Sequence, residues 1–266
     1  MADISRDGGF AEVGDRCWVL RSELLASNVG LVGGAAGLLL VDTGSSEVEG
    51  RRVVEQVRRL GAGDVLTVFH THGHVGHTSG DVVVSEAFDG PPVVAHEEAA
   101  TGLVPAPTAT FSSARVVDLG DRQVELLHPG RGHTAGDAVA RVPDADVVFA
   151  GDLVEGSARG SAVPRFGAGC HPLAWPGALD LVIGLLTASS VVVPGHGRPV
   201  DRELVERQRD AVGVVAETIR DLASRGVPVA DALASAQWPF PTERLAHAVR
   251  RGYEQLPRSA RSLPLI

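Results

Sequence analysis

The sequence predicts a layered α/β protein. Short apolar runs of strand length alternate with segments that have helical periodicity. Polar residues recur just past the ends of those apolar runs. A rigid sheet holds the loops at its strand ends in register, so such positions are where a layered α/β protein builds a site. The candidates in such positions are Asp42, the histidines from His70 to His77, His133, Asp152 and His196.

Composition is consistent with one globular domain. The chain has 266 residues, of which 44% are apolar, enough for a sizeable core. We expect a single domain over 1–266, with its core at about 10–200 and a helical C-terminal extension at about 201–256. The two cysteines, Cys17 and Cys170, have no metal-binding spacing and are expected to be buried free thiols.

Charge and hydropathy indicate which classes of binding partner and which compartment to expect. The formal net charge of −9 argues against nucleic-acid or anionic-membrane binding, which needs a basic surface, but permits a small-molecule substrate. The first residues contain acids and no apolar signal region. The apolar run over 29–41 is too short and too rich in glycine to span a membrane. We therefore expect a cytoplasmic protein.

In the first half of the chain, the sequence predicts four strands and one helix. Ser46 and Glu49 form a capping-box pattern, and Gly61 is a natural C-terminal stop. Between them, apolar residues at 53, 54, 57 and 60 share one helical face. The predicted strands cover 16–20, 27–32, 37–41 and 65–69, and the last runs directly into the histidines.

The second half repeats the alternation and then becomes helical. Predicted strands cover 93–95, 115–118, 123–127, 138–142, 147–150 and 190–193. A short helix is expected from His96, another over 175–186, a long amphipathic one from Asp201, and two shorter ones near 229–236 and 242–255. Residues 156–172, rich in Gly and Pro, are expected to form a surface loop or lid. Its Arg159 and Arg165 are either substrate contacts or ordinary surface residues.

The stretch HTHGHVGH, residues 70–77, is the main functional signal because it holds four of the ten histidines. Imidazole is the commonest protein ligand for zinc and suits several other transition metals. His72 and His74 can point the same way from an extended loop, and His77 can reach a neighbouring position. Distant glycine-containing turns, GHTAGD, AGD and PGHG, add His133, Asp152 and His196. A single histidine is usually structural, but this set is hard to explain as solvated surface.

These motifs, in this order, resemble those of the metallo-β-lactamase-fold superfamily of metallohydrolases. The resemblance covers about 28–200 and rests on NVGLVGGAAGLLLVDTGSS, THGHVGHTSG, GHTAGD, VVFAGD and VVVPGHG. It implies a four-layer αββα sandwich, with two sheets face to face, helices outside and a metal site at one edge.

The resemblance also implies roles for individual residues. His72, His74 and His133 look like the ligands of a first metal ion, and His77 and His196 like ligands of a second. Asp152 resembles the carboxylate that bridges the two ions, which makes Asp152 and His196 the catalytic candidates of a binuclear site. Asp42 resembles the acid that supports the site from behind. The implied cofactor is Zn²⁺, one ion or two, with iron and manganese as open alternatives. Oligomeric state stays open.

The sequence departs from the family at Gly76. The usual pattern is H-x-H-x-D-H, and its aspartate binds the second metal and orients the attacking water. Three outcomes are open: one tightly bound metal, two metals with another group completing the second, or a weakened site. His70 either reaches the pocket or bonds to backbone at the strand end. Asp137 is expected to accept hydrogen bonds within its turn.

Three functions are compatible with these residues. The first is a metal-dependent hydrolase that acts on an ester, thioester, lactone or amide bond of a small molecule. The alternative is a non-hydrolytic enzyme of a specialised-metabolite pathway, a lyase, isomerase or cyclisation catalyst, that uses the metal as a Lewis acid. The third is a metal-binding protein with a weakened site.

Overall fold

A computed structural model describes residues 8–22, 26–101, 103, 105–156 and 162–257, and its strands form two sheets. The first sheet has seven strands in the order β1-β2-β3-β4-β5-β6-β7, antiparallel from β1 to β4 and parallel from β4 to β7. Their bounds are Ala11–Gly14, Cys17–Arg21, Asn28–Gly33, Leu38–Val41, Val65–His70, Val93–His96 and Ala109–Phe111. The sheet places the carboxyl ends of β4 and β5 side by side.

The second sheet has five strands in the order β12-β11-β10-β9-β8. Their bounds, from β8 to β12, are Ala114–Asp118, Gln123–Leu127, Val139–Val142, Val147–Glu155 and Val191–His196. Only β11 and β12 pair in parallel. The ends of these two strands therefore reach the same edge of the sheet.

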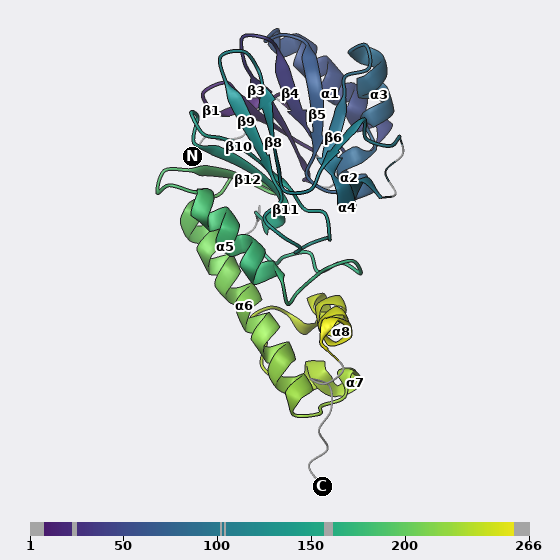
Figure 1. The fold of residues 1–266 in the computed structure, drawn as a ribbon, viewed down its shortest axis with the longest axis vertical. Helices are drawn as coiled ribbons and strands as arrows, with labels where there is room; N and C mark the ends of the chain where they lie inside the picture. Colours follow the sequence, from purple (N-terminus) through teal and green to yellow (C-terminus); the bar gives the residue numbers. More distant parts are fainter. Residues whose placement is uncertain (1–7, 23–25, 102, 104, 157–161, 258–266) are drawn as a thin grey trace.

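Helices cover the outer face of each sheet, which confirms the predicted αββα order (Figure 1). Helices α1 (Glu47–Leu60) and α3 (Asp81–Ala87) lie on the first sheet, and α5 (Trp175–Leu185) and α6 (Arg202–Ser224) on the second. The helical C-terminal region continues with α7 (Val229–Ala232) and α8 (Ala246–Gln255), beyond the sheets (Figure 1). The shorter helices are α2 (Val75–Thr78), α4 (Glu97–Ala100) and the 3₁₀ turns Leu233–Ser235 and Thr242–Arg244.

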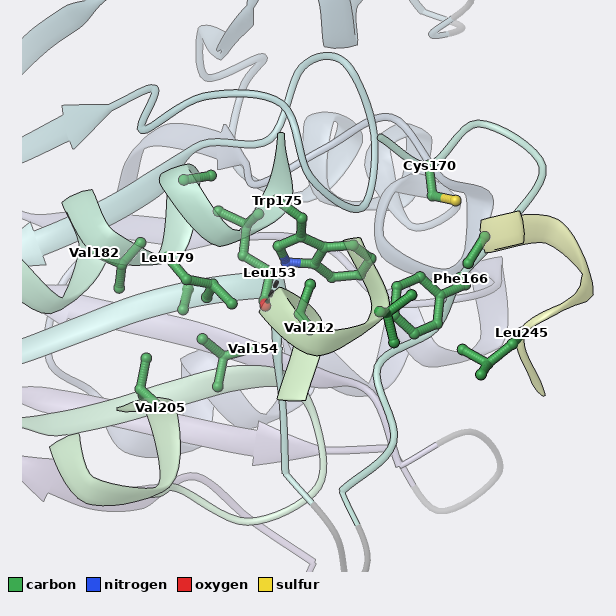
Figure 2. Packing of buried hydrophobic residues seen from close by; sticks show 14 of the residues in the cluster. Leu153, Val154, Phe166, Cys170, Trp175, Leu179, Val182, Val205, Val212 and Leu245 are labelled. Carbon is green, nitrogen blue, oxygen red and sulfur yellow. Dashed lines mark hydrogen bonds between the residues drawn. The ribbon is translucent and has the colours of Figure 1, made fainter. Parts of the chain in front are cut away.

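Apolar side chains fill all three interfaces between the four layers. Phe69 and Phe149 lie between the two sheets, and Leu40 and Val53 lie between the first sheet and α1. Trp175 and its neighbours fill the space between the second sheet and the C-terminal helices (Figure 2). Burial of this surface is the main term that stabilises the layered arrangement.

The ends of α1 follow the predicted signals. The hydroxyl of Ser46 accepts from the amide of Glu49, and Gly61 adopts the left-handed conformation after the last turn. The reciprocal half of the capping box is replaced, because the Glu49 carboxylate accepts from the amide of Ser45 and bonds to the hydroxyl of Ser22.

Two expectations need correction. The strand predicted over 147–150 continues as β11 to Glu155, with every residue buried. The segment predicted as a surface loop turns inward at Phe166 and Cys170, which are 5% and 0% exposed. Residues 157–161, including Arg159, lie outside the described residues.

Both cysteines are buried free thiols as expected. Within the described ranges, no helix is long and apolar enough to cross a membrane.

Candidate metal centre

The predicted site residues converge where β4, β5, β11 and β12 end. His72 and His74 come directly after β5, in the turn that leads into α2, and His77 lies within α2. Asp152 lies within β11, and His196 is the last residue of β12. His133 comes from the loop between β9 and β10. Side chains far apart in sequence thus meet at one edge of the sandwich.

Two overlapping groups of side chains have the spacing of a metal site. The first is His72, His74 and His133, and the second is His72, His77 and Asp152. Within each group, one ligand atom from every residue lies within 4.8 Å of the others. In the first group Nε2 of His133 lies 2.9 Å from Nδ1 of His74. His72 is common to both groups.

The Asp152 carboxylate faces both sets of histidines. Its Oδ2 lies 3.3 Å from Nε2 of His133 and 3.8 Å from Nε2 of His72. Its Oδ1 lies 3.4 Å from Nε2 of His77 and 3.4 Å from Nε2 of His196. One oxygen is therefore presented to each side of the cluster, an arrangement suited to a carboxylate shared by two ions.

Hydrogen bonds behind the histidines fix their tautomers. Nδ1 of His133 lies 2.8 Å from the carbonyl oxygen of Arg165, which can only accept, so Nδ1 carries the proton. Nδ1 of His77 donates in the same way to Asp42 Oδ2 at 2.9 Å. In His133, whose pKa burial lowers, the proton on Nδ1 leaves Nε2 with a lone pair directed toward Asp152. Burial also acts to lower the pKa of His77, but the charges of Asp152 and Asp42 outweigh it and raise that pKa to about 10, so Nε2 of His77 carries a proton that a metal ion would displace. Metal-binding histidines are usually oriented by such partners.

Thr71 extends this support to His72. Its hydroxyl donates to Asp42 Oδ2 at 2.8 Å and lies 3.1 Å from Nδ1 of His72. The hydroxyl thus accepts the Nδ1 proton of His72, and Nε2 is again the free nitrogen. Sequence reasoning missed Thr71, because a threonine beside a histidine has no distinctive spacing.

Burial keeps part of the cluster neutral. Burial, with the nearby His77, holds the pKa of His72 well below its usual value, and burial also lowers the pKa values of His74 and His133. Neutral imidazole is the form that binds a metal ion. For Asp152 burial favours protonation, but the charge of His77 outweighs it and holds the Asp152 pKa well below its ordinary value. Asp152 is therefore ionised at neutral pH.

Two atoms in this cluster are buried without a hydrogen-bond partner among the described residues. They are Nε2 of His72 and Oδ1 of Asp152. A buried polar atom without a partner costs free energy, so such atoms call for an explanation. Both are atoms that a metal ion would contact, and a set of imidazoles with one carboxylate suits zinc. The residues present fit a metal ion.

His70 and Asp42 lie behind the cluster. Nε2 of His70 lies 2.9 Å from Asp81 Oδ2, and its Nδ1 lies 3.6 Å from Asp42 Oδ1. Asp81 also accepts from the hydroxyl of Thr43 at 2.7 Å. His70 is therefore engaged by two carboxylates, and neither a backbone partner nor the open pocket accounts for its position.

Gly76 has free space around its Cα atom. An added Cβ would have no heavy atom within 4 Å, and the φ of Gly76 lies outside the range that disfavours other residues. The backbone therefore does not require glycine here. Gly195, in the PGHG turn, is the opposite case, because any Cβ there would collide with Oδ1 of Asp152.

Side chains within the turns beside the cluster stabilise those turns by hydrogen bonds and ring stacking. Asp137 accepts from the amide of Thr134 at 2.8 Å and from its hydroxyl at 2.7 Å, as expected. His96, at the start of α4, accepts from the amide of Glu98, and its ring stacks on that of His128 with centroids 3.9 Å apart. His96 and His128 thus support a loop and are not in either metal-binding group.

Comparisons with known proteins identify a family and a fold. The family model of the metallo-beta-lactamase superfamily matches residues 23–196. A type 2 metallo-beta-lactamase from Bacillus cereus is 26% identical over 189 residues, covering 69% of this chain and 72% of that protein.

Solved structures of related proteins share the fold. A metallo-beta-lactamase from Pontibacter korlensis superimposes with a TM-score of 0.69 at 24% identity, over 77% of this chain and 98% of its own. The metallo-beta-lactamase FIM-1 from Pseudomonas aeruginosa, in its mono-zinc form, gives 0.66 at 21% identity, over 78% and 95%.

Proposed function

The chain belongs to the metallo-beta-lactamase superfamily, and we propose that it is a zinc-dependent hydrolase of a small molecule. The bond attacked is an ester, thioester, lactone or amide. His72, His74, His77, His133, Asp152 and His196 are the proposed metal ligands, with Asp152 and His196 nearest the chemistry and Asp42 and His70 behind them.

One observation supports this proposal most strongly. The Asp152 carboxylate presents one oxygen to Nε2 of His133 and the other to Nε2 of His77 and His196. Buried ionised groups are normally paired or bound to a metal, and the unpartnered Oδ1 of Asp152 and Nε2 of His72 fit that rule.

A zinc ion at this site would supply a Lewis acid and would lower the pKa of a bound water to about 7. The protein residues supply the remaining requirements. Asp42 and Thr71 bind Nδ1 of His77 and of His72, and so orient Nε2 of each ring toward the proposed ions. His74 is exposed, so it marks the side on which substrate reaches the cluster. Asp152, kept ionised, can accept a hydrogen bond from an incoming water and so orient it.

We propose that His72, His74 and His133 hold one zinc ion tightly. The second position has His77, His196 and a share of Asp152, and it lacks the carboxylate that position 76 supplies in the family. With one anionic ligand fewer, its affinity for a cation should be lower.

The open space at Gly76 also favours a second candidate function. Without a side chain there to orient water, the same zinc site suits Lewis-acid chemistry on an enolate or phenolate, as in a lyase, isomerase or cyclisation catalyst. The space around Gly76 leaves room for part of a substrate where the family has a carboxylate.

Zinc titration followed by a substrate panel tests both functions. Chelator-treated wild type is titrated with Zn²⁺ and then assayed on esters, thioesters, lactones and amides, beside His72→Ala. His247→Gln, at an exposed histidine of α8, controls for adventitious surface binding. We expect zinc uptake and turnover in wild type and in the control, and loss of both in His72→Ala. Zinc uptake without turnover would favour the second function, and no uptake at micromolar zinc would overturn both.

A further inference from the structure

Strand β11 changes its pairing at the site. Its pairs with β10 cover only residues 147–149, and its register with β12 shifts on both sides of Gly151. Gly151 has a positive φ of 54°. This irregularity turns Asp152 toward the histidines, but the ladder with β12 has no paired residues between Gly151 and Glu155, and buried backbone groups there need other partners.

The C-terminal helices supply those partners. The carbonyl oxygen of Leu153 accepts from the indole Nε1 of Trp175 at 3.1 Å and from Nε2 of Gln208 at 2.9 Å. The Oε1 of Gln208 accepts from the amide of Glu155 at 3.0 Å. Gln208 is 5% exposed and lies in α6 between the buried Val205 and Val212, which Figure 2 shows beside Leu153 and Val154. The side-chain amide of Gln208 thus bonds to the carbonyl oxygen of Leu153 and to the backbone amide of Glu155, in the strand segment that follows Asp152.

The held segment contacts further parts of the site. The amide of Gly156 donates to the carbonyl oxygen of His196 at 2.9 Å. The Glu155 carboxylate pairs with Nε of Arg165 at 3.2 Å, and the carbonyl oxygen of Arg165 is the partner of His133 Nδ1. Fixing residues 153–156 therefore restrains the backbone beside Asp152, His196 and, through Arg165, His133.

We propose that Gln208 is a positioning residue of the metal centre, and that the C-terminal helical region is for this reason a working part of the site. This inference rests on the proposed zinc site. Gln208 lies beyond the 23–196 segment matched by the family model, so the family motifs do not account for it. Without Gln208, the amide of Glu155 loses its partner, and Asp152 is free to move relative to the histidines.

The test compares two losses on the same face of α6. Gln208→Leu removes both hydrogen bonds and puts an apolar side chain of similar size in their place. Val212→Ala, one turn further along, removes packing and no hydrogen bond. Zinc affinity is measured by competition with a chromogenic chelator, and thermal unfolding of the zinc-free proteins is followed in parallel. Both variants should unfold at lower temperature than wild type.

Their zinc affinities should differ. Because loss of a partner that orients metal ligands weakens metal binding by roughly 10-fold or more, Gln208→Leu should bind zinc at least that much less tightly. Val212→Ala should stay within about twofold of wild type, since it leaves the Asp152 strand bonded. Equal affinities in the two variants would overturn the inference.

Two further outcomes are decisive. If Gln208→Leu does not fold, Gln208→Met removes the same two hydrogen bonds with an unbranched side chain of similar length. That variant should bind zinc several-fold less tightly, and unchanged affinity would overturn the inference. If wild type itself takes up no zinc, the proposed function fails and this inference fails with it, whereas normal uptake by wild type and Gln208→Leu alike rejects only the role of Gln208.

Discussion

The Asp42 carboxylate lies 2.9 Å from Nδ1 of His77 and accepts the hydroxyl of Thr71 at 2.8 Å with the same oxygen, Oδ2. Asp42 is 2% exposed, and its backbone is in the left-handed region, with a φ of 61°. A non-glycine residue in that conformation is uncommon and is often found at functional sites. Asp42 thus links two proposed ligands, His77 directly and His72 through Thr71.

Removal of the Asp42 charge should weaken zinc binding. In Asp42→Asn the side chain keeps its size, but the anion that orients His77 and raises its basicity is gone. We expect zinc affinity to fall roughly 10-fold, as for other partners of metal-binding histidines. Chelator competition measures it, with Asp180→Asn as the matched control, because Asp180 pairs with Arg209 on the exposed side of α5. Equal affinity in the two variants would mean that Asp42 does not support the proposed ligands.

Restoration of the carboxylate at position 76 should create a second zinc position. Gly76 has open space around it, so Gly76→Asp can place a carboxylate near His77 and His196 without displacing a neighbour. Elemental analysis should find about one zinc per chain in wild type and about two in Gly76→Asp. Gly76→Ala adds a Cβ without a ligand and should match wild type. Two zinc ions in wild type would mean that another group already completes the second position.

Loss of the proton on His70 should make the zinc-free protein less stable at alkaline pH than at neutral pH. Burial acts to lower the pKa of His70, but the hydrogen bond to Asp81 and the charges of Asp81 and Asp42 outweigh it and raise the pKa to about 9. Because this is above the unfolded value of 6.5, the stabilisation is fully present below pH 6.5 and is lost as pH rises through 9.

The loss can be measured against a neutral variant. Between pH 6 and pH 9 the free energy of unfolding of wild type should fall by roughly 3 kcal/mol more than that of His70→Gln. Urea unfolding of both chelator-treated proteins at several pH values provides the comparison. Parallel curves for the two proteins would show that His70 is not charged in the folded state.

Arg122 should affect stability without affecting the site. Its guanidinium is 3% exposed and bonds to Asp15 Oδ2 at 2.7 Å, to Asp144 Oδ2 at 2.8 Å and to the carbonyl oxygens of Asp15 and Gly33. It joins the two sheets at the end opposite the histidines. Arg122→Leu should lower the free energy of unfolding by about 3 kcal/mol, because the buried carbonyl of Gly33 loses its donor and two carboxylates lose their partner. Zinc affinity should not change, and a large loss of affinity would mean that the two ends of the sandwich are coupled.

Local signals predicted much of this fold. The helix from Ser46 to Gly61 begins and ends where its caps indicate, and the strands on either side of the histidine stretch lie close to their predicted ranges. The family motifs indicated the layer order. These features depend on residues near one another in sequence, so a pattern can carry them.

The parts that escaped prediction depend on tertiary contacts. β11 runs on to Glu155 because Trp175 and Gln208, from later helices, hold its backbone. Phe166 lies inside the core because its ring meets that of Trp175, with centroids 5.1 Å apart. A Gly- and Pro-rich segment has no periodicity that reveals which side chain turns inward.

The site shows the same division. The positions of the histidines and Asp152 follow from strand ends and glycine-containing turns. The contact of Thr71 with His72, and the position of His70 between two carboxylates, could be seen only in the packed structure, because a histidine at a strand end has many available partners.

Zinc binding by chelator-treated wild type and His72→Ala tests the proposed metal centre most directly, since His72 belongs to both groups of proposed ligands. Isothermal titration with Zn²⁺ gives the stoichiometry and affinity of both proteins under the same conditions. We expect at least one zinc ion per chain to bind at or below micromolar concentration in wild type, and that binding to be lost in His72→Ala. Absence of binding in wild type, or equal binding in the two proteins, would contradict the proposed site.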